Sequence, residues 1–561
     1  MRKILALATL CLLATVSGGS AMSLAVAPAK LPPARTPSCP APMYAGATEL
    51  LAALPHASYA CAEELAIALR PRAGPAEADA LIALAATGHD TRARRNALRV
   101  LGRLAESPRG SRARELVLRS HAAILRELLE RTLREEHDNF LLQDALWILD
   151  SVFYPSQSAA PAMERVAAGH GLAPALRYRA AAARARLIYA RPGPLAPDDR
   201  DFITGGLRSD DPGVRAAAAM AAARLRGEQL APEVRDELAR ALAAAWAAEP
   251  PLALAPDDPD ARGAARIVFR ESSPTSLTAR AAIARARDRL ESGAAHLGTL
   301  RSAYEALALP YTLTRDGITV RSGLPPERLP GLLSEAARVR ASLAELLGAD
   351  LASPLPGEAS PHLTVLIFAR QGIYRDYVRA FTPFTVEGDG TYDEAMATLY
   401  THGRTTAQSE NSLEESLRHE LTHHYTAQQL FPGRWLTPGY HAEPKGWLDE
   451  GLAEVMAGLG PAGPAPRPAQ LARLCARGTP PGLTTLLGQR EGYDRYGRFD
   501  YDGAWALVAY LHLERPEALR RLAAAYRDGS YRLIDWPRLT GLTLAQAEAE
   551  WHRAIAQWCG R

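Results

Sequence analysis

Residues 419–423 read His-Glu-Leu-Thr-His, two histidines four positions apart with a glutamate beside the first. Side chains at positions i and i+4 lie one above the other on a helix, so both imidazoles can bind the same metal ion. A carboxylate next to such a pair is in place to act as a base on metal-activated water. We therefore expect His419 and His423 to bind zinc and Glu420 to be the catalytic general base.

Two glutamates further along the chain offer the third ligand. Glu450 and Glu454 stand four residues apart in the segment 447–454, Trp-Leu-Asp-Glu-Gly-Leu-Ala-Glu, whose leucines predict the buried face of a second helix. Glu450 can complete a zinc site of two histidines and one glutamate, which leaves the fourth position for water. Glu454, one turn later, can accept a hydrogen bond from the outer nitrogen of a ligand histidine. Residue 429 is a glutamine, so the third ligand is not the histidine of the longer three-histidine motif.

The segment that carries the two histidines must be helical, and its flanks predict a helix. Ser412 and Glu415 have the spacing of a capping box, which satisfies free N–H groups at a helix start. Leu413, Leu417 and Leu421 follow at intervals of four and form an apolar stripe. This stripe can face the core while the histidines occupy a neighbouring face.

The sequence upstream of these helices predicts a mixed α/β domain. Strand-like residues on both sides of 315–317, Arg-Asp-Gly, indicate a hairpin. A helix is expected over 327–348, and the apolar run 363–368 predicts a buried strand. Because the composition changes near residue 308, we expect a separate domain to begin around residue 300.

The first half of the chain predicts helices only. At 210–215 two aspartates precede a proline, a glycine and an Ala-rich run, which is typical of a helix start. Further helices are expected near residues 113–133, 138–152, 174–190 and 231–247. This loose repetition is typical of HEAT-like pairs of helices, with an irregular helical bundle as the alternative. The histidines of this half have no ligand spacing, and we expect no catalytic residue there.

The fold class expected from these patterns is a multidomain protein, mainly α plus α+β. It comprises a HEAT-like helical-repeat module followed by a metal-binding domain. The expected boundaries are a signal peptide at 1–21, a Pro-rich lead-in at 22–48, the helical module at 49–300 and the metal-binding domain at 301–561, with an upper α/β part to about residue 430 and a lower helical part after it.

The N-terminus has the pattern of a secretory signal, because a basic start precedes an apolar run over 4–16 and then small residues. No other run reaches the length that a membrane-spanning helix needs. We therefore expect a secreted, soluble chain. Four cysteines remain after the signal, and they allow two disulfides in three possible pairings. We favour Cys39–Cys61 and Cys475–Cys559, because each pair closes a loop within one end of the chain.

Composition and charge limit the partners. The chain has 561 residues, of which 65 are basic and 62 acidic. Its net charge of +3 gives no strong overall positive potential that would attract nucleic acid. With 47% hydrophobic and 23% charged residues it has the balance of an ordinary globular protein. We expect a monomer with no nucleic-acid or membrane partner.

The two metal-binding segments resemble the peptidase unit of the microbial collagenases, zinc peptidases of the gluzincin group that includes thermolysin. The second segment begins 24 residues after His423. Residues 388–392, Gly-Asp-Gly-Thr-Tyr, are similar to this family's Gly-rich edge strand, and 399–405 and 501–507 to its next strand and a late helix. The resemblance implies a thermolysin-like peptidase domain, and the helical first half fits the helical activator module of these collagenases.

The resemblance also implies roles for residues around the zinc site. Gly388, Gly390 and Tyr392 would belong to an edge strand to which an extended peptide substrate adds as a further strand. Glu394 falls where the family places a carboxylate on a calcium ion, so calcium is an expected cofactor beside zinc.

Catalysis of this kind also needs a donor aimed at the developing oxyanion, a role taken by tyrosine or histidine in gluzincins. By resemblance Tyr501 is the expected donor, and Tyr493 and Tyr496 are the alternatives.

Two functions are compatible with the sequence. The first is a secreted zinc endopeptidase that acts on collagen, gelatin or another extracellular protein. The second is a helical-repeat binding protein whose zinc-site half is inactive or structural. The complete set of ligands together with Glu420 favours the first, because a binding protein gains nothing from a poised base.

Overall fold

The computed structural model describes residues 46–88, 90–107, 111–255, 275–291, 293–348, 354–355, 362–384, 388–405, 408–433, 444–461, 463–477, 482–489 and 499–560. The expected signal peptide, Cys39, Tyr493 and Tyr496 lie outside these residues. The chain divides into two compact units, residues 1–122 and 123–561.

The described part of the first unit is helical. Its elements are α2 (Ala47–Ala53), η1 (Leu54–His56), α3 (Tyr59–Leu69), α4 (Pro75–Thr87), α5 (Thr91–Ala105), α6 (Arg112–Glu115) and η2 (Leu116–Ser120). Buried leucines and alanines form most of its core, and the buried Asn96 ties α5 to the first helices. The Asn96 Nδ2 donates to the carbonyls of Leu54 at 2.9 Å and Ala57 at 3.0 Å.

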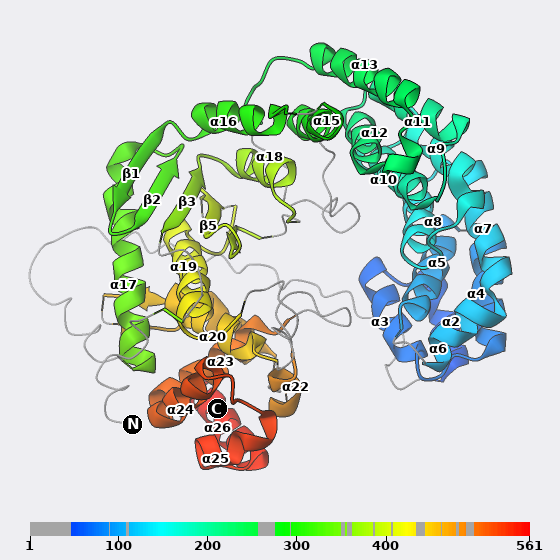
Figure 1. Cartoon of the computed structure of the whole chain (residues 1–561). Helices are drawn as coiled ribbons and strands as arrows, with labels where there is room; N and C mark the ends of the chain where they lie inside the picture. The colour runs from blue at the N-terminus through cyan, green and yellow to red at the C-terminus, as the bar shows by residue number, and fades with distance from the viewer. Residues whose placement is uncertain are drawn as a thin grey trace, which may run out of the picture. The chain divides into compact units, whose positions relative to one another are not determined.

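The second unit begins with further helices (Figure 1): α7 (Ala122–Glu135), α8 (Asn139–Ser151), η3 (Gln157–Ala159), α9 (Ala160–Ala168), α10 (Pro174–Ala190), α11 (Pro197–Leu207), α12 (Pro212–Arg224), η4 (Gly227–Gln229), α13 (Pro232–Ala248), α15 (Ser276–Leu290) and α16 (His296–Ala308). The helix start predicted at 210–215 is confirmed, because the Asp211 carboxylate accepts from the N–H groups of Gly213 and Val214 at 2.7 and 3.1 Å. Small residues bring neighbouring helices close together. A Cβ at Gly206 of α11, for example, would lie 2.8 Å from that of Ala218 of α12.

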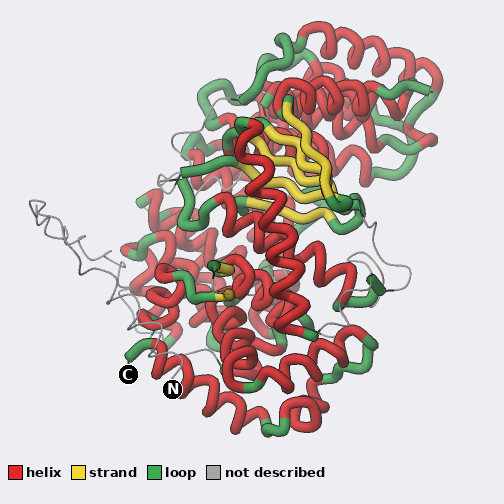
Figure 2. The backbone as a smooth tube through the Cα atoms, turned by 90° about the vertical axis from the view of Figure 1, so that its left-hand side faces the viewer, coloured by secondary structure: helices red, strands yellow, loops and turns green. Residues whose placement is uncertain are grey.

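A five-stranded sheet follows in the order β1-β2-β3-β5-β4 (yellow in Figure 2). Its strands are β1 (Tyr311–Arg315), β2 (Ile318–Ser322), β3 (Leu363–Phe368), β4 (Gly390–Asp393) and β5 (Thr398–His402). The predicted hairpin is confirmed: β1 and β2 pair antiparallel around Asp316 and Gly317, both with positive φ (54° and 78°), as a tight hairpin turn requires. β3 pairs parallel with β2 and β5, whereas β4 runs antiparallel to β5 and is an edge strand.

Helices cover both faces of this sheet (Figure 1). Alternate residues of β3 point to opposite sides, as the pleat requires. Val365 and Ile367 pack into one core with α17 (Leu329–Leu347) and α19 (Leu413–Gln429). Leu366 and Phe368 pack into the other with α15, α16 and α18 (Gln371–Phe381). The sheet thereby places α19, the helix with the two histidines, directly beneath β5 and β4.

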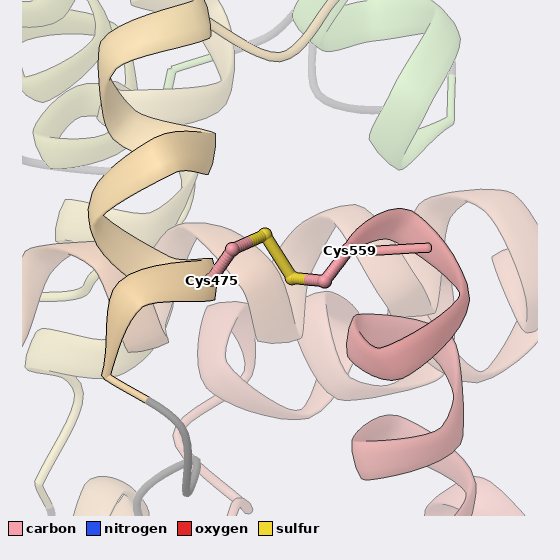
Figure 3. The surroundings of a disulfide bond; sticks show 2 residues. All are labelled: Cys475 and Cys559. Atoms are coloured by element: carbon pink, nitrogen blue, oxygen red, sulfur yellow. A yellow bond between two sulfur atoms is a disulfide. The ribbon is translucent and has the colours of Figure 1, made fainter. Parts of the chain in front are cut away.

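The C-terminal part is helical: α20 (Gly446–Ala457), α21 (Pro468–Ala476), α22 (Leu483–Leu487), α23 (Tyr501–Glu514), α24 (Pro516–Arg527), η7 (Leu533–Asp535), α25 (Trp536–Thr540) and α26 (Leu544–Trp558). A short pair of strands, β6 (Leu459–Gly460) and β7 (Gly463–Pro464), follows α20. The predicted disulfide Cys475–Cys559 is confirmed and joins α21 to the end of α26 (Figure 3). The Cys39–Cys61 pairing remains a prediction, because residue 39 lies outside the described residues. Within the described part of the chain, none of the helices has the length and hydropathy to span a membrane.

Candidate active site

The three predicted ligands come together between α19 and α20. The Nε2 atoms of His419 and His423 lie 3.2 Å apart, and each lies close to the Oε2 of Glu450, at 3.4 and 3.5 Å. The two histidines occupy successive turns of α19, and the predicted helix with its capping box is confirmed. In the described residues these three side chains form the one cluster of histidine, cysteine and acidic ligand atoms that could hold a metal ion.

Hydrogen-bond partners fix the orientation of both rings. The Nδ1 of His419 lies 3.3 Å from Glu454 Oε1, and the Nδ1 of His423 lies 3.2 Å from Asp449 Oδ1. A carboxylate on the outer nitrogen holds the ring and directs the other nitrogen to the metal. Glu454 therefore lies where it was predicted. Asp449 was not predicted, although its place directly before Glu450 puts it on the same helix as the other two acidic residues.

This donor set fits zinc. Four ligands at zinc's usual distance of ~2.0–2.1 Å from a tetrahedral centre stand about 3.3 Å from one another, close to the separations of the two imidazole nitrogens and the Glu450 oxygen. The Oε2 of Glu450 is also buried with no hydrogen-bond partner among the described residues, as expected of an atom reserved for a metal.

The charges of the site follow from its burial and its carboxylates. Burial opposes the charged imidazole of His423, but Asp449 and Glu450 raise its pKa well above the ordinary value. Burial likewise opposes ionisation of Glu450, yet the two histidines lower its pKa. The metal-free site thus favours a charged His423 beside an ionised Glu450, and a metal ion binding there must displace the proton.

Glu420 lies beside the ligands but outside their cluster. Burial raises its pKa, while His419 and His423 act in the opposite direction. A raised pKa suits a group that must both accept and release a proton near neutral pH. Glu420 also touches the edge strand, because a Cβ at Gly390 would lie 2.9 Å from its Cγ.

The predicted edge-strand residues divide into two groups. Gly390 and Tyr392 lie in β4, whereas Gly388 lies two residues before the strand starts. The Tyr392 hydroxyl is 2.9 Å from His424 Nδ1 of α19. Burial lowers the pKa of His424 to about 4, so the ring is neutral and can accept a hydrogen bond from the phenol.

Glu394 follows β4 in the turn to β5, and its role in binding calcium remains a prediction.

Tyr501 begins α23 and packs edge-on against Phe499, with ring centroids 4.9 Å apart. It is 38% exposed. Gly451, next to the ligand Glu450, lets α23 approach, because a Cβ there would lie 2.7 Å from the carbonyl oxygen of Ala504. α23 is thus held against the ligand helix, while the role of Tyr501 toward an oxyanion remains a prediction.

Sequence reasoning missed the residues that hold Glu454. Its Oε2 accepts from Gln470 Nε2 at 2.7 Å and from the guanidinium of Arg467, both on or next to α21. Arg467 also donates to Asn411 Oδ1 at 2.5 Å, ahead of α19. The only sequence signal was a pair of polar residues near the start of a short helix, which is common at surfaces.

Comparison with known proteins gives one consistent result. The family described as collagenase, Peptidase_M9, matches residues 266–551. Collagenase ColA of Bacillus cereus is 29% identical over 256 residues, 44% of this chain and 26% of that protein. Collagenase ColQ1 of another Bacillus cereus strain is 30% identical over 234 residues, 40% and 24% of the two chains. Collagenase ColT of Clostridium tetani is 27% identical over 210 residues, 36% and 20%. The matched stretches therefore span about a quarter or less of these relatives, and the family match begins upstream of the expected domain start at 301.

Proposed function

This chain belongs to the collagenase family of peptidases, and on that premise we propose that it is a zinc-dependent endopeptidase. The observation that carries the proposal is the convergence of two imidazole nitrogens and one carboxylate oxygen beside an additional carboxylate, Glu420, that is not part of the cluster. A structural metal site has no use for a free carboxylate at this place.

His419, His423 and Glu450 would hold the ion. Zinc bound there supplies Lewis acidity toward a peptide carbonyl and toward water. Glu420 takes the proton from the attacking water on its carboxylate and then delivers it to the nitrogen of the leaving amine. Asp449 and Glu454 keep the two imidazoles oriented during this exchange.

The edge strand supports a way to bind the substrate. Among the strands of the described residues β4 pairs only with β5, so the N–H and C=O groups on its other side could pair with an extended peptide. Gly390 abuts Glu420, so a peptide added along β4 would run past the base. The substrate class we propose is collagen, gelatin or another extracellular protein.

The domain assignment and location belong to the same proposal. We assign a gluzincin-type, thermolysin-like fold to residues 301–561 and a HEAT-like, activator-type module to 49–300. This module would serve as a second surface that grips a triple helix, whose glycines are buried at its axis until it is opened. Residues 1–21 would direct secretion as a signal peptide.

The first test is cleavage of gelatin by the purified zinc-loaded protein, with and without a chelator. We expect cleavage that the chelator abolishes and that added zinc restores. Absence of cleavage by zinc-loaded protein would favour the helical-repeat binding protein with an inactive zinc site.

Glu420→Gln tests the role of the base. We expect turnover to be abolished while zinc remains bound, because the amide cannot take up a proton and is not a ligand. Turnover is measured on gelatin, and zinc content by metal analysis of the same sample. Full activity of this variant would show that another group is the base.

Calcium at Glu394 is tested by thermal unfolding. We expect added calcium to raise the melting temperature of demetallated protein, and this increase to be absent from Glu394→Ala. An unchanged melting temperature of the parent protein would remove calcium from the proposal.

A further inference from the structure

Strand β4 and the residue before it lie along α19 and are linked to it at three successive turns. Asp389, directly before the strand, is linked to Ser416 through the side chain of Arg404. Gly390 abuts Glu420. Further along, Tyr392 reaches His424. Ser416, Glu420 and His424 are four residues apart, so they form one face of the helix. This face differs from the one on which His419 and His423 meet α20.

The contact between Gly390 and Glu420 determines how close β4 comes to the proposed base, Glu420. A Cβ at Gly390 would lie 2.9 Å from the Cγ of Glu420 and 3.0 Å from its Oε1, closer than ordinary side-chain contacts allow. The glycine permits this approach but supplies no group that maintains it. The spacing must be held by the contacts on either side.

Arg404 provides the contact on one side, and its side chain is completely buried. Its Nη1 donates to Ser416 Oγ of α19 at 2.9 Å. Its Nη2 donates to the backbone oxygen of Asp389 at 3.0 Å and to Thr401 Oγ1 of β5 at 2.6 Å. One guanidinium therefore joins the helix of the zinc ligands to the two strands at this edge of the sheet.

The remaining N–H groups of Arg404 are also used. Nε donates to the carbonyl of His402 at 3.2 Å, and Nη1 lies 3.2 Å from Asp389 Oδ2. All five donors of the guanidinium thus have acceptors, in the fixed planar arrangement that arginine provides. A lysine has three donors on one atom and cannot bridge the same acceptors.

We propose that Arg404 is a positioning residue that fixes β4 against Glu420, so that a peptide added to β4 is aligned with the base. This rests on the proposed function, because it assumes that the substrate adds to β4 and that Glu420 is the base. Arg404 acts through the strand and the helix and does not touch the substrate. Its loss leaves β4 paired with β5, so peptide still binds but meets the base out of alignment.

The test compares Arg404→Lys with the parent protein, both full length and zinc-loaded, on a quenched fluorogenic peptide with a Gly-X-Y repeat. We expect kcat to fall by ~10- to 100-fold, the effect of about 1 Å of misplacement, with little change in KM. Zinc affinity, measured by competition with a chromophoric chelator, should stay unchanged. Amide hydrogen exchange should become faster in 388–393 but not in α20.

Two further variants separate positioning from general stability. Ser416→Ala removes one acceptor of Arg404 at a helical position that suits alanine, and it should give a smaller loss of kcat in the same direction. Arg184→Met removes an equally buried arginine, whose side chain is 2% exposed and paired with Asp199 in the helical part of this unit. This control should lower the melting temperature without changing kcat on the peptide.

The proposal is overturned if Arg404→Lys keeps the parent kcat and the parent exchange of 388–393. It is equally overturned if Arg184→Met lowers kcat as much, because the effect would then be loss of stability alone. If the parent protein does not cleave the peptide, the proposed function fails. The exchange of 388–393 in Arg404→Lys and Ser416→Ala then decides by itself whether Arg404 positions the strand.

Discussion

The two proposed histidine ligands are oriented by different carboxylates, both of which come from helix α20. Asp449 of α20 lies beside the outer nitrogen of His423, and Glu454 lies beside the outer nitrogen of His419. Glu450 belongs to the cluster itself. Asp449 is itself held by the Thr426 hydroxyl at 2.7 Å. The orientation of each of these two rings is therefore fixed before a metal binds.

Tyr501→Phe is the prediction that tests the oxyanion donor. We expect the variant to keep its fold and zinc but to lose turnover by ~10²–10³-fold, the usual cost of removing one such donor. Turnover is measured on a short peptide. Tyr311→Phe is the matched control, because Tyr311 is 40% exposed, much like Tyr501, but lies on β1.

Parent-level turnover in Tyr501→Phe would transfer the role to another residue. Loss in Tyr493→Phe or Tyr496→Phe instead would identify one of the two alternative tyrosines.

At the scale of elements, α21 connects the disulfide to the zinc site. Cys475 near its end is bonded to Cys559, 84 residues later, while Arg467 and Gln470 at its start hold Glu454. Two interactions thus hold one short helix at its opposite ends. Glu454 in turn contacts the Nδ1 of His419, so the position of α21 affects a proposed metal ligand.

Replacing both Cys475 and Cys559 by serine should therefore have two effects. The free energy of unfolding should fall by up to about 4–5 kcal/mol, the chain-entropy value for a loop of this length. Zinc affinity should fall by ~10-fold, because the partner of a ligand histidine is less well held. Urea unfolding and chelator competition measure the two. A loss of stability with unchanged zinc affinity would show that packing alone positions α21.

The contact between α18 and the start of α15 predicts that the stability of the protein depends on pH. Asp376 of α18 is 4% exposed and accepts a hydrogen bond from Thr275, the N-cap of α15. Burial raises its pKa from 3.8 to about 6, although Thr275 and Arg379 act in the opposite direction. The folded state therefore binds the proton of Asp376 more tightly than the unfolded state does. This binding adds to the free energy of unfolding fully below pH 3.8, and the contribution is lost as the pH rises through about 6.

Asp376→Asn should therefore be more stable than the parent protein at pH 7.5, by at most about 3 kcal/mol, and similar to it near pH 4. Chemical unfolding of both proteins at the two pH values measures the difference. Asp316→Asn, at a side chain that is 85% exposed, is the control and should show no such pH-dependent gain. An equal effect of Asp376→Asn at both pH values would contradict a raised pKa.

At the scale of the whole molecule, every predicted site residue belongs to the second unit, residues 123–561, and the family match lies within it. Removal of residues 1–122 should therefore leave zinc binding and cleavage of a short peptide unchanged. Cleavage of native collagen should fall, because a triple helix must be gripped as well as cut. Both rates are measured on the same preparation, and a parallel loss of peptide cleavage would show that the first unit supports the site.

The sequence by itself identified the candidate ligands and the local elements around them. The spacing of His419 and His423, the capping box at Ser412 and the hairpin at Asp316 could all be predicted, because each depends on backbone geometry within a few residues. The Cys475–Cys559 disulfide was also predicted, from the parity of the cysteines and their grouping at the chain ends.

Only the tertiary structure decided which groups meet across elements. It pairs Asp449 with His423 and Glu454 with His419, places α15 and α16 on the sheet, and brings Arg404 between β4 and α19. These contacts join segments whose separation and crossing depend on how side chains pack, and sequence spacing does not encode that distance. The chemistry of the site is therefore visible in the order of residues, whereas its alignment is a property of the packed molecule.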